Sequence, residues 1–258
     1  MRGLLLLLSA AACLAAPAAG EHSLVIRDNI GRAWQAEPIN WDVAFSPGEW
    51  AGGEFRLLRD GEPIVAQVDV TGRHGDGSVK SAVVRFIIDQ LAKDASTTVT
   101  FQPGQAGPRE TDLRAVREGG ALVLANARVA VRLADGAGEG GVGSPILGFR
   151  TPSGKWTGGG AYECRTAKPA RAATELLESG PVRCAARVTV TFDNGRRHVV
   201  TVALWAGSPS VEIEEDFDIG PDEMYRFKQY ADDRDELAWE WWSWYGDREG
   251  LEEDHPNR

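Results

Sequence analysis

Alternating apolar and polar positions in the first half of the chain predict β-strands. Val68 and Val70 alternate with polar neighbours, which is typical of a strand with one buried face. A Gly-rich corner at residues 72–77 follows, and residues 79–88 are then almost continuously apolar, which predicts a strand covered on both faces. Asp60-Gly61 predicts a tight hairpin turn. The strands predicted in this half are residues 23–27, 39–45, 54–58, 64–70, 79–88 and 97–101.

The second half continues in the same pattern. Residues 183–217 predict an antiparallel meander of three strands with one buried face, turning at 193–195 and again at 206–209. Asp193-Asn194-Gly195 supplies the positive-φ residues expected of a two-residue turn. Residues 121–133 predict a hairpin folded at Ala125-Asn126, and residues 136–145 a flexible loop.

The C-terminal segment combines aromatic and acidic residues. A helix starting at Asp233, with Glu236 completing a capping box and Gly246 ending it, fits the local signals. Four tryptophans would then cover every face of that helix, and neither a helix nor a strand could bury them all alone. They are Trp239, Trp241, Trp242 and Trp244. We therefore expect exposed aromatic side chains that a further domain would cover, and an incomplete domain at this end.

Composition adds a targeting segment and a domain boundary. Residues 1–20 are typical of a signal peptide, with a basic start, an apolar stretch and small residues near Ala19, so we expect a secreted or periplasmic protein. A lipoprotein anchored through Cys13 is the less favoured alternative, because Ala10 stands where Leu is expected. No other segment is long and apolar enough to span a membrane. The expected division is a β-barrel at 21–104, a Gly- and Pro-rich linker at 105–112 and a β-sandwich at 113–258.

The distribution of charge and the two cysteines of the mature chain limit the expected partners and the expected disulfide bonding. The net charge of −10 belongs to the end of the chain: residues 212–258 hold 17 acidic and 5 basic residues, a net of −12, and the remainder 21 acidic and 23 basic, a net of +2. With no basic stripe, nucleic acid is not an expected partner. Cys164 and Cys184 remain after export into an oxidising compartment, which favours a disulfide over two buried thiols.

Two blocks of sequence resemble a known family. Residues 67–86, with the core DGSVKSAVVRF, resemble the N-terminal RIFT-type barrel of the PcRGLX/YetA-like family of exo-rhamnogalacturonan lyases. GPVRCAARVTV and LWAGSPSVEIEEDF, at 180–190 and 204–217, are similar to the supersandwich-like β-sandwich that follows it. The resemblance implies an all-β protein, a closed barrel followed by an antiparallel sandwich. It also implies that the catalytic helical toroid, absent here, is the missing partner domain of the same protein.

Candidate functional residues are weighed against ordinary structural roles. Uronate elimination needs a base at the sugar C5 and a group that neutralises the adjacent carboxylate. His74 is favoured as a solvated corner residue, and Lys80 and His198 as strand residues facing solvent or a sheet edge. The remaining available carriers are Lys228, Tyr225, Tyr230 and His255. No catalytic residue is assigned.

Two groups could contact a carbohydrate, and one acidic strand suggests calcium. Carbohydrate-contact candidates are Trp239, Trp241, Trp242, Trp244, Tyr225, Arg226 and Lys228, against a core or inter-domain packing role. The acidic residues are Glu212, Glu214, Glu215, Asp216 and Asp218. On a strand Glu212, Glu214, Asp216 and Asp218 share one face opposite Val211, Ile213 and Phe217, which favours a solvated face over a metal site. Neither a metal nor a cofactor is expected.

These observations leave two functional hypotheses. The first is the non-catalytic N-terminal portion of an exported polysaccharide lyase-like protein acting on rhamnogalacturonan or pectin-type glycans. The second is a stand-alone secreted carbohydrate-binding or cell-envelope interaction protein without catalysis. In both, a polysaccharide or oligosaccharide is the expected partner, and it would approach the near-neutral body rather than the acidic end.

Overall fold

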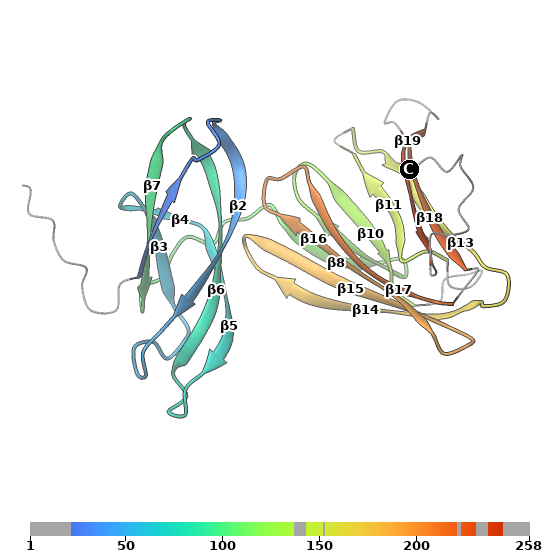
Figure 1. The fold of residues 1–258 in the computed structure, drawn as a ribbon, viewed down its shortest axis with the longest axis horizontal. Coiled ribbons are helices and arrows are strands. Elements are labelled where there is room, and N and C mark those ends of the chain that lie inside the picture. Colours follow the sequence, from blue (N-terminus) through green and yellow to red (C-terminus); the bar gives the residue numbers. More distant parts are fainter. Residues whose placement is uncertain (1–21, 137–142, 152, 221–222, 231–236, 245–258) are drawn as a thin grey trace, which may run out of the picture.

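The protein is built from β-strands in two modules (Figure 1). The computed structural model describes residues 22–136, 143–151, 153–220, 223–230 and 237–244, and all regular elements in those ranges are strands. This confirms the all-β class predicted from the alternating pattern. The predicted targeting segment, residues 1–20, lies outside the described residues.

The first module is two antiparallel sheets that enclose one core. One sheet has the order β1-β7-β3-β4 and the other β2-β6-β5. Phe86, Phe101 and Leu57 are fully buried between them. The strands are β1 (His22–Arg27), β2 (Trp34–Ala44), β3 (Phe55–Arg59), β4 (Glu62–Ile64), β5 (Ala66–Arg73), β6 (Val79–Leu91) and β7 (Ser96–Pro103).

The expected closed barrel is replaced by two separate sheets. β4 and β5 are divided in sequence only by Val65, yet they are edge strands of different sheets. Closure requires a continuous ladder of backbone hydrogen bonds with a fixed stagger around the ring. The described ladders do not continue from one sheet into the other. The chain therefore turns a corner at Val65, and buried side chains join the two sheets.

The long apolar strand β6 has two different faces. Val84 and Phe86 point into the core and are fully buried, whereas Arg85 and Ile87 on the opposite face are only partly exposed. Coverage of both faces was predicted from the unbroken apolar run. The second face is covered in part, and it is the face turned toward the second module (Figure 1).

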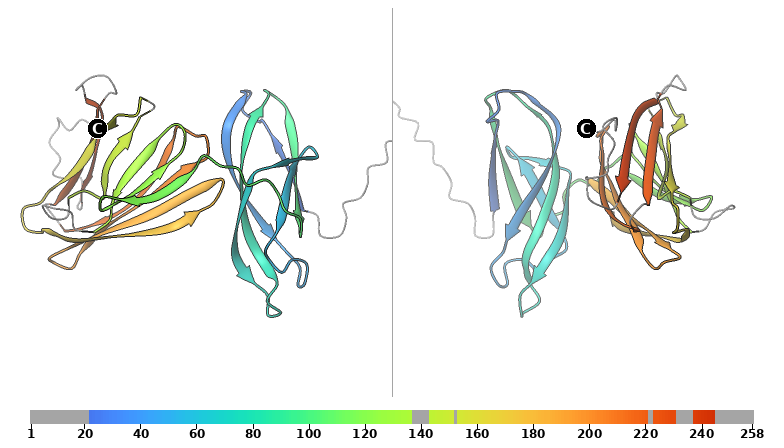
Figure 2. Two further views of the ribbon diagram at one scale, coloured as in Figure 1. Left: turned by 180° about the vertical axis from the view of Figure 1, so that it is seen from behind. Right: turned by 45° about the vertical axis from the view of Figure 1, so that its right-hand side comes forward.

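The second module packs a four-stranded sheet against two others around a second core. The four-stranded sheet, β14-β15-β16-β17, contains the predicted meander, and its antiparallel register confirms that prediction. The two modules lie side by side along the long axis of the molecule (Figure 2).

The sheet β12-β11-β10-β9-β8 consists of β8 (Arg114–Glu118), β9 (Ala121–Ala125), β10 (Ala130–Ala134), β11 (Ile146–Arg150) and β12 (Trp156–Thr157). The remaining strands are β13 (Gly159–Glu163), β14 (Pro169–Ser179), β15 (Arg183–Phe192), β16 (Arg197–Trp205), β17 (Val211–Asp218), β18 (Met224–Tyr230) and β19 (Leu237–Trp244), with a third sheet in the order β13-β18-β19.

The turns follow local sequence chemistry, with two adjustments. Asp60 and Gly61 both have positive φ and join β3 to β4, as predicted. Between β15 and β16 only Gly195 has positive φ, and the N–H of Phe192 bonds to the carbonyl of Arg196, so the loop has three residues rather than two. The β9–β10 hairpin turns two residues later than predicted, at Ala127-Arg128, where the Asn126 side chain accepts two loop N–H groups. The predicted flexible loop falls largely on residues 137–142, outside the described residues.

The segment expected to form a helix after Asp233 contains a strand. β19 pairs antiparallel with β18, so that Trp242 lies opposite Arg226 and Trp239 opposite Gln229. Aromatic residues favour pleated structure, and the free edge of β18 supplies a ladder that a helix could not use. The proposed capping residues Asp233 and Glu236 lie outside the described residues.

The predicted disulfide does not form: Cys164 and Cys184 are both free thiols. Cys184 is near the start of β15, whereas Cys164 lies close to Asp193, just beyond its other end. Eight residues of strand separate these ends, or roughly 26 Å at ~3.3 Å per residue. A disulfide requires Cα atoms within about 7 Å. Burial raises the pKa of Cys164 to about 12 and that of Cys184 to about 11, which disfavours the thiolate form of both.

Candidate functional site at the junction of the two modules

The predicted carbohydrate-contact residues do not form one exposed surface. Tyr225 is completely buried and its hydroxyl lies 2.8 Å from Ser144 Oγ, so a glycan in solvent cannot reach it and that assignment is wrong. Burial also raises the pKa of the Tyr225 phenol. Arg226 forms an ion pair with Glu163, and Lys228 is half-buried on the same strand. The side chains of the four tryptophans lie outside the described residues.

His198 is buried rather than solvent-facing, which corrects the expectation from sequence. It has no exposed surface, its Nδ1 lies 2.9 Å from Tyr162 Oη and its Nε2 lies 2.6 Å from Glu215 Oε1. Burial raises the pKa of Tyr162, so the phenol stays protonated beside the imidazole. The three groups satisfy one another inside the core, which is a structural role.

The other candidate residues are dispersed. His74 lies in the β5–β6 turn, as predicted, but it is half-buried rather than solvated, with Nε2 2.9 Å from the Phe45 carbonyl. Lys80 is exposed on β6, as predicted. Both belong to the first module, whereas His198 and Tyr225 belong to the second. His255 and the side chain of Tyr230 lie outside the described residues. The structure does not bring these predicted residues together.

The acidic strand β17 alternates as predicted. Glu212, Glu214, Asp216 and Asp218 are exposed, and the intervening residues are half-buried. The exception to the apolar alternation is Glu215, which faces inward and accepts from His198. Within the described ranges, no group of three or more potential ligands could hold a metal ion.

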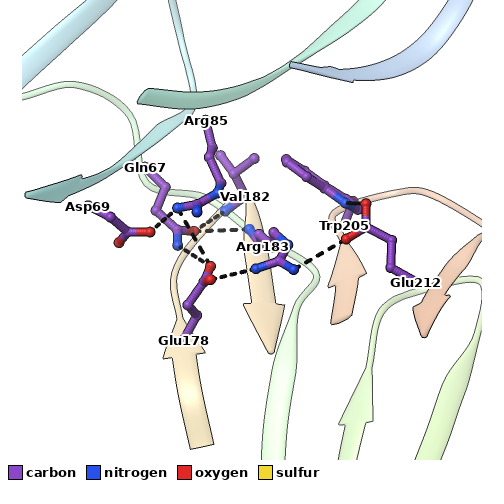
Figure 3. Close-up of polar contacts among 8 residues, drawn as sticks. All are labelled: Gln67, Asp69, Arg85, Glu178, Val182, Arg183, Trp205 and Glu212. Atoms are coloured by element: carbon purple, nitrogen blue, oxygen red, sulfur yellow. Dashed lines mark hydrogen bonds and ion pairs between the residues drawn. The ribbon is translucent and has the colours of Figure 1, made fainter. Parts of the chain in front are cut away.

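Gln67 is at the centre of the contact between the modules (Figure 3). It lies on β5 and is 7% exposed. Its Oε1 accepts from the backbone N–H groups of Val182 at 3.4 Å and Arg183 at 3.0 Å, and its Nε2 donates to Glu178 Oε2 at 3.2 Å. Three hydrogen bonds offset the desolvation of this buried amide. One side chain of the first module therefore fixes the approach of the second.

A glycine makes that approach possible. A Cβ atom added to Gly180 would lie 1.9 Å from Gln67 Oε1, far inside van der Waals contact. Gly180 precedes Pro181 in the turn between β14 and β15, and its N–H bonds to the Arg183 carbonyl. The turn therefore presents its backbone N–H groups directly to the glutamine.

Charged side chains surround the glutamine. Arg85, which is paired with Gln67 across β5 and β6, forms an ion pair with Asp69 and lies 3.8 Å from Glu178 Oε2. Arg183 pairs with the same Glu178 carboxylate from the second module. Glu178 is thus held between two guanidinium groups, one from each module (Figure 3). We call Gln67, Asp69, Arg85, Glu178, Arg183, Trp205 and Glu212 the junction network.

An arginine–tryptophan pair completes the network. The Arg183 guanidinium carbon lies over the Trp205 ring, 5.7 Å from its centre, and Arg183 Nη2 lies 3.2 Å from Glu212 Oε2. Trp205 Nε1 donates to Glu212 Oε1 at 2.6 Å. Indole, guanidinium and carboxylate therefore satisfy each other.

Two clefts flank the contact. The smaller, about 220 Å³, includes Gln67 and Arg109 in its lining, and the larger, about 460 Å³, includes Asp89 and Glu110. Pro108 of the segment predicted as linker and Pro181 line both. Two carboxylates in a mostly apolar cleft disfavour an anionic ligand there.

The junction network can hold the modules, because its carboxylates, a residue type that can also act as a base or nucleophile, are engaged in ion pairs with Arg85 and Arg183. Its side chains are an amide, carboxylates, guanidinium groups and an indole. Most of their polar atoms contact one another, and Arg85 Nε is the exception, since it is buried without a hydrogen-bond partner. Sequence analysis missed Gln67 and Gly180, because their roles arise from residues more than a hundred positions apart in the chain.

The comparisons do not place the chain in a family. No model of a known protein family matches it, and no curated protein sequence does. Among the described residues, no helix is long and apolar enough to cross a bilayer.

Proposed function

We propose that this chain is the non-catalytic β portion of an exported polysaccharide lyase-like protein acting on rhamnogalacturonan or pectin-type glycans. The junction supports the proposal, because a buried glutamine and paired charges fix one β module against the other. Such a unit positions a glycan or a catalytic partner. The resemblance of residues 67–86 and 180–217 to lyase modules supplies the substrate class.

Paired measurements on the purified protein test this function. Incubation with rhamnogalacturonan should release no unsaturated uronate, measured by its ultraviolet absorbance, because the predicted bases do not converge. Calorimetry with pectic oligosaccharides should show binding. Release of unsaturated uronate would show a complete enzyme, and absence of binding heat would remove the glycan from the proposal.

The second candidate is a stand-alone secreted carbohydrate-binding protein. It is favoured by the dispersal of His74, Lys80 and His198, since a binding protein needs no converging bases. Coding sequence that continues in frame into a helix-rich domain would support the lyase-like unit, whereas expression of the chain by itself, with glycan binding intact, would support this alternative.

A further inference from the structure

A tryptophan and two arginines lie together on the five-stranded sheet of the second module. The Arg132 guanidinium carbon is 4.2 Å from the centre of the Trp156 ring, and that of Arg150 is 5.9 Å from it. Arg150 is paired with Trp156 across β11 and β12, and Arg132 with Gly148 across β10 and β11. We call these three residues the Arg–Trp–Arg group.

The group lies on the face of the sheet that is turned away from the core. Leu122, Leu124, Val131 and Leu133 alternate with its positions and are buried in the core of the second module. The outward face has a floor of small apolar residues, Val123, Ala125 and Ala130, that Trp156 packs against. Strand alternation therefore separates a packed inner face from an outer face with charged and aromatic side chains.

The guanidinium groups of Arg132 and Arg150 form no ion pair with any residue that the structure describes. Arg183 shows what the same arrangement looks like when complete. It lies over Trp205 and is neutralised by Glu178 and Glu212. At the Arg–Trp–Arg group the indole and cations are present, and no described residue supplies the carboxylate. A ligand carboxylate would supply the missing component.

A cleft of about 370 Å³ adjoins the group, lined by Glu118, Gly119, Ala121, Arg132 and Leu147. This volume lies in the ~300–1,000 Å³ range of small-ligand sites. Leu147 is 40% exposed because the strand bulges between the pairs formed by Arg132 and Leu133. Gly148, which is paired with Arg132, has no side chain that could cover the guanidinium group. Glu118 lines the cleft too, and its charge opposes an anionic group beside it, so a ligand carboxylate is accommodated on the Arg132 side of the cleft.

We propose that this outer face binds a sugar ring that bears a carboxylate, as in a hexuronate residue of an acidic glycan. The carboxylate bonds to Arg132 and Arg150, and an apolar face of the ring packs against Leu147. A neutral sugar offers the same apolar face and no carboxylate, so it gains only part of this interaction. The identification of the ligand as a glycan rests on the proposed function, whereas the preference for a carboxylate rests on the geometry.

Binding of a galacturonate trimer to the full chain, measured by calorimetry, tests the site. The neutral galactose trimer is the ligand control. The double substitution Arg132→Gln with Arg150→Gln should weaken galacturonate binding by about tenfold to hundredfold, since hydrogen bonds to a charged group are lost. Arg187→Gln is the matched control, because Arg187 is an exposed strand residue on the opposite sheet. It should leave binding unchanged.

The outcomes separate the site from the function. Galacturonate binding that survives the double substitution overturns the site and leaves the proposed function standing. Equal binding of the neutral trimer, or of inorganic phosphate at matched ionic strength, overturns the uronate preference. A shift of the Trp156 indole signal by monomeric galacturonate, assigned with Trp156→Phe, without any binding of pectic polymers, would support the site and overturn the proposed function.

Discussion

Two tryptophan rings in the described part of this protein have an arginine over them, and the surroundings of these arginines differ. Arg183 over Trp205 is neutralised by Glu178 and Glu212 at the junction. Arg132 over Trp156 has no carboxylate partner among the described residues. The same pairing of side chains therefore fixes two modules together when its charge is satisfied within the chain, and it suits the proposed uronate site when no described carboxylate neutralises it.

Removing the shared carboxylate at the junction should have the largest effect. Glu178→Ala leaves Arg85 and Arg183 partly buried without their common partner, and we expect a loss of about 2–3 kcal/mol in the free energy of unfolding, below the full cost of breaking a wholly buried pair. Denaturant unfolding measures it. Glu175→Ala, an exposed carboxylate on the same strand, should change stability by less than about 0.5 kcal/mol. Equal losses in the two variants would contradict a special role for Glu178.

Acid should remove the stabilisation that the ionised Glu223 carboxylate gives to the fold. Burial alone would raise the pKa of Glu223, but hydrogen bonds from the Thr166 hydroxyl and the N–H groups of Ala167 and Thr166 lower it to about 2. Because the folded pKa lies below the ordinary value of 4.5, the stabilisation is complete above pH 4.5 and is lost as pH falls toward about 2.

The denaturant midpoint of unfolding of the unsubstituted protein should therefore decrease as the pH is lowered through this range. Glu223→Gln should lose about 1–2 kcal/mol at neutral pH and flatten the acid dependence. Glu214→Gln, exposed on β17, is the control and should retain the native slope. If the Glu223→Gln variant kept the same pH dependence of unfolding as the unsubstituted protein, other carboxylates would account for the loss of stability in acid.

The sequence predicted what depends on neighbouring residues and missed what depends on distant ones. The strand β6 and the meander were correct because alternation and turn residues act locally. Barrel closure and the disulfide were wrong because they require specific pairing of distant strands. Glu215 carried a usable signal: it is an acidic residue at a position where the alternation of β17 expects an apolar one. Its side chain therefore lies on the inward face, where it contacts buried His198. Arg132 and Trp156 carried none, since the pairing of β10 with β11 and of β11 with β12 brings them together.

Crowding Gln67 should produce an intermediate effect. In Gly180→Ala the new methyl group occupies the position of Gln67 Oε1, so the glutamine must leave its hydrogen bonds with Arg183 and Glu178. A flexible side chain can move aside, so we expect a loss of about 1–2 kcal/mol. Gly75→Ala is matched, since its Cβ would meet nothing within 4 Å. Small-angle scattering should show a broader distribution of module separations for Gly180→Ala alone, and unchanged scattering would argue that Gln67 does not fix the modules.

The smallest effect on stability should come from the Arg–Trp–Arg group. Arg132→Gln with Arg150→Gln removes two neighbouring positive charges that have no described carboxylate partner, so the free energy of unfolding should change by less than about 0.5 kcal/mol, with relief of repulsion offsetting the lost cation–π contact. The same double variant is the one expected to lose galacturonate binding. Stability retained with binding lost is a combination that a structural role would not produce. A loss as large as that of Glu178→Ala would instead mean that these arginines, like those of the junction, hold the fold together.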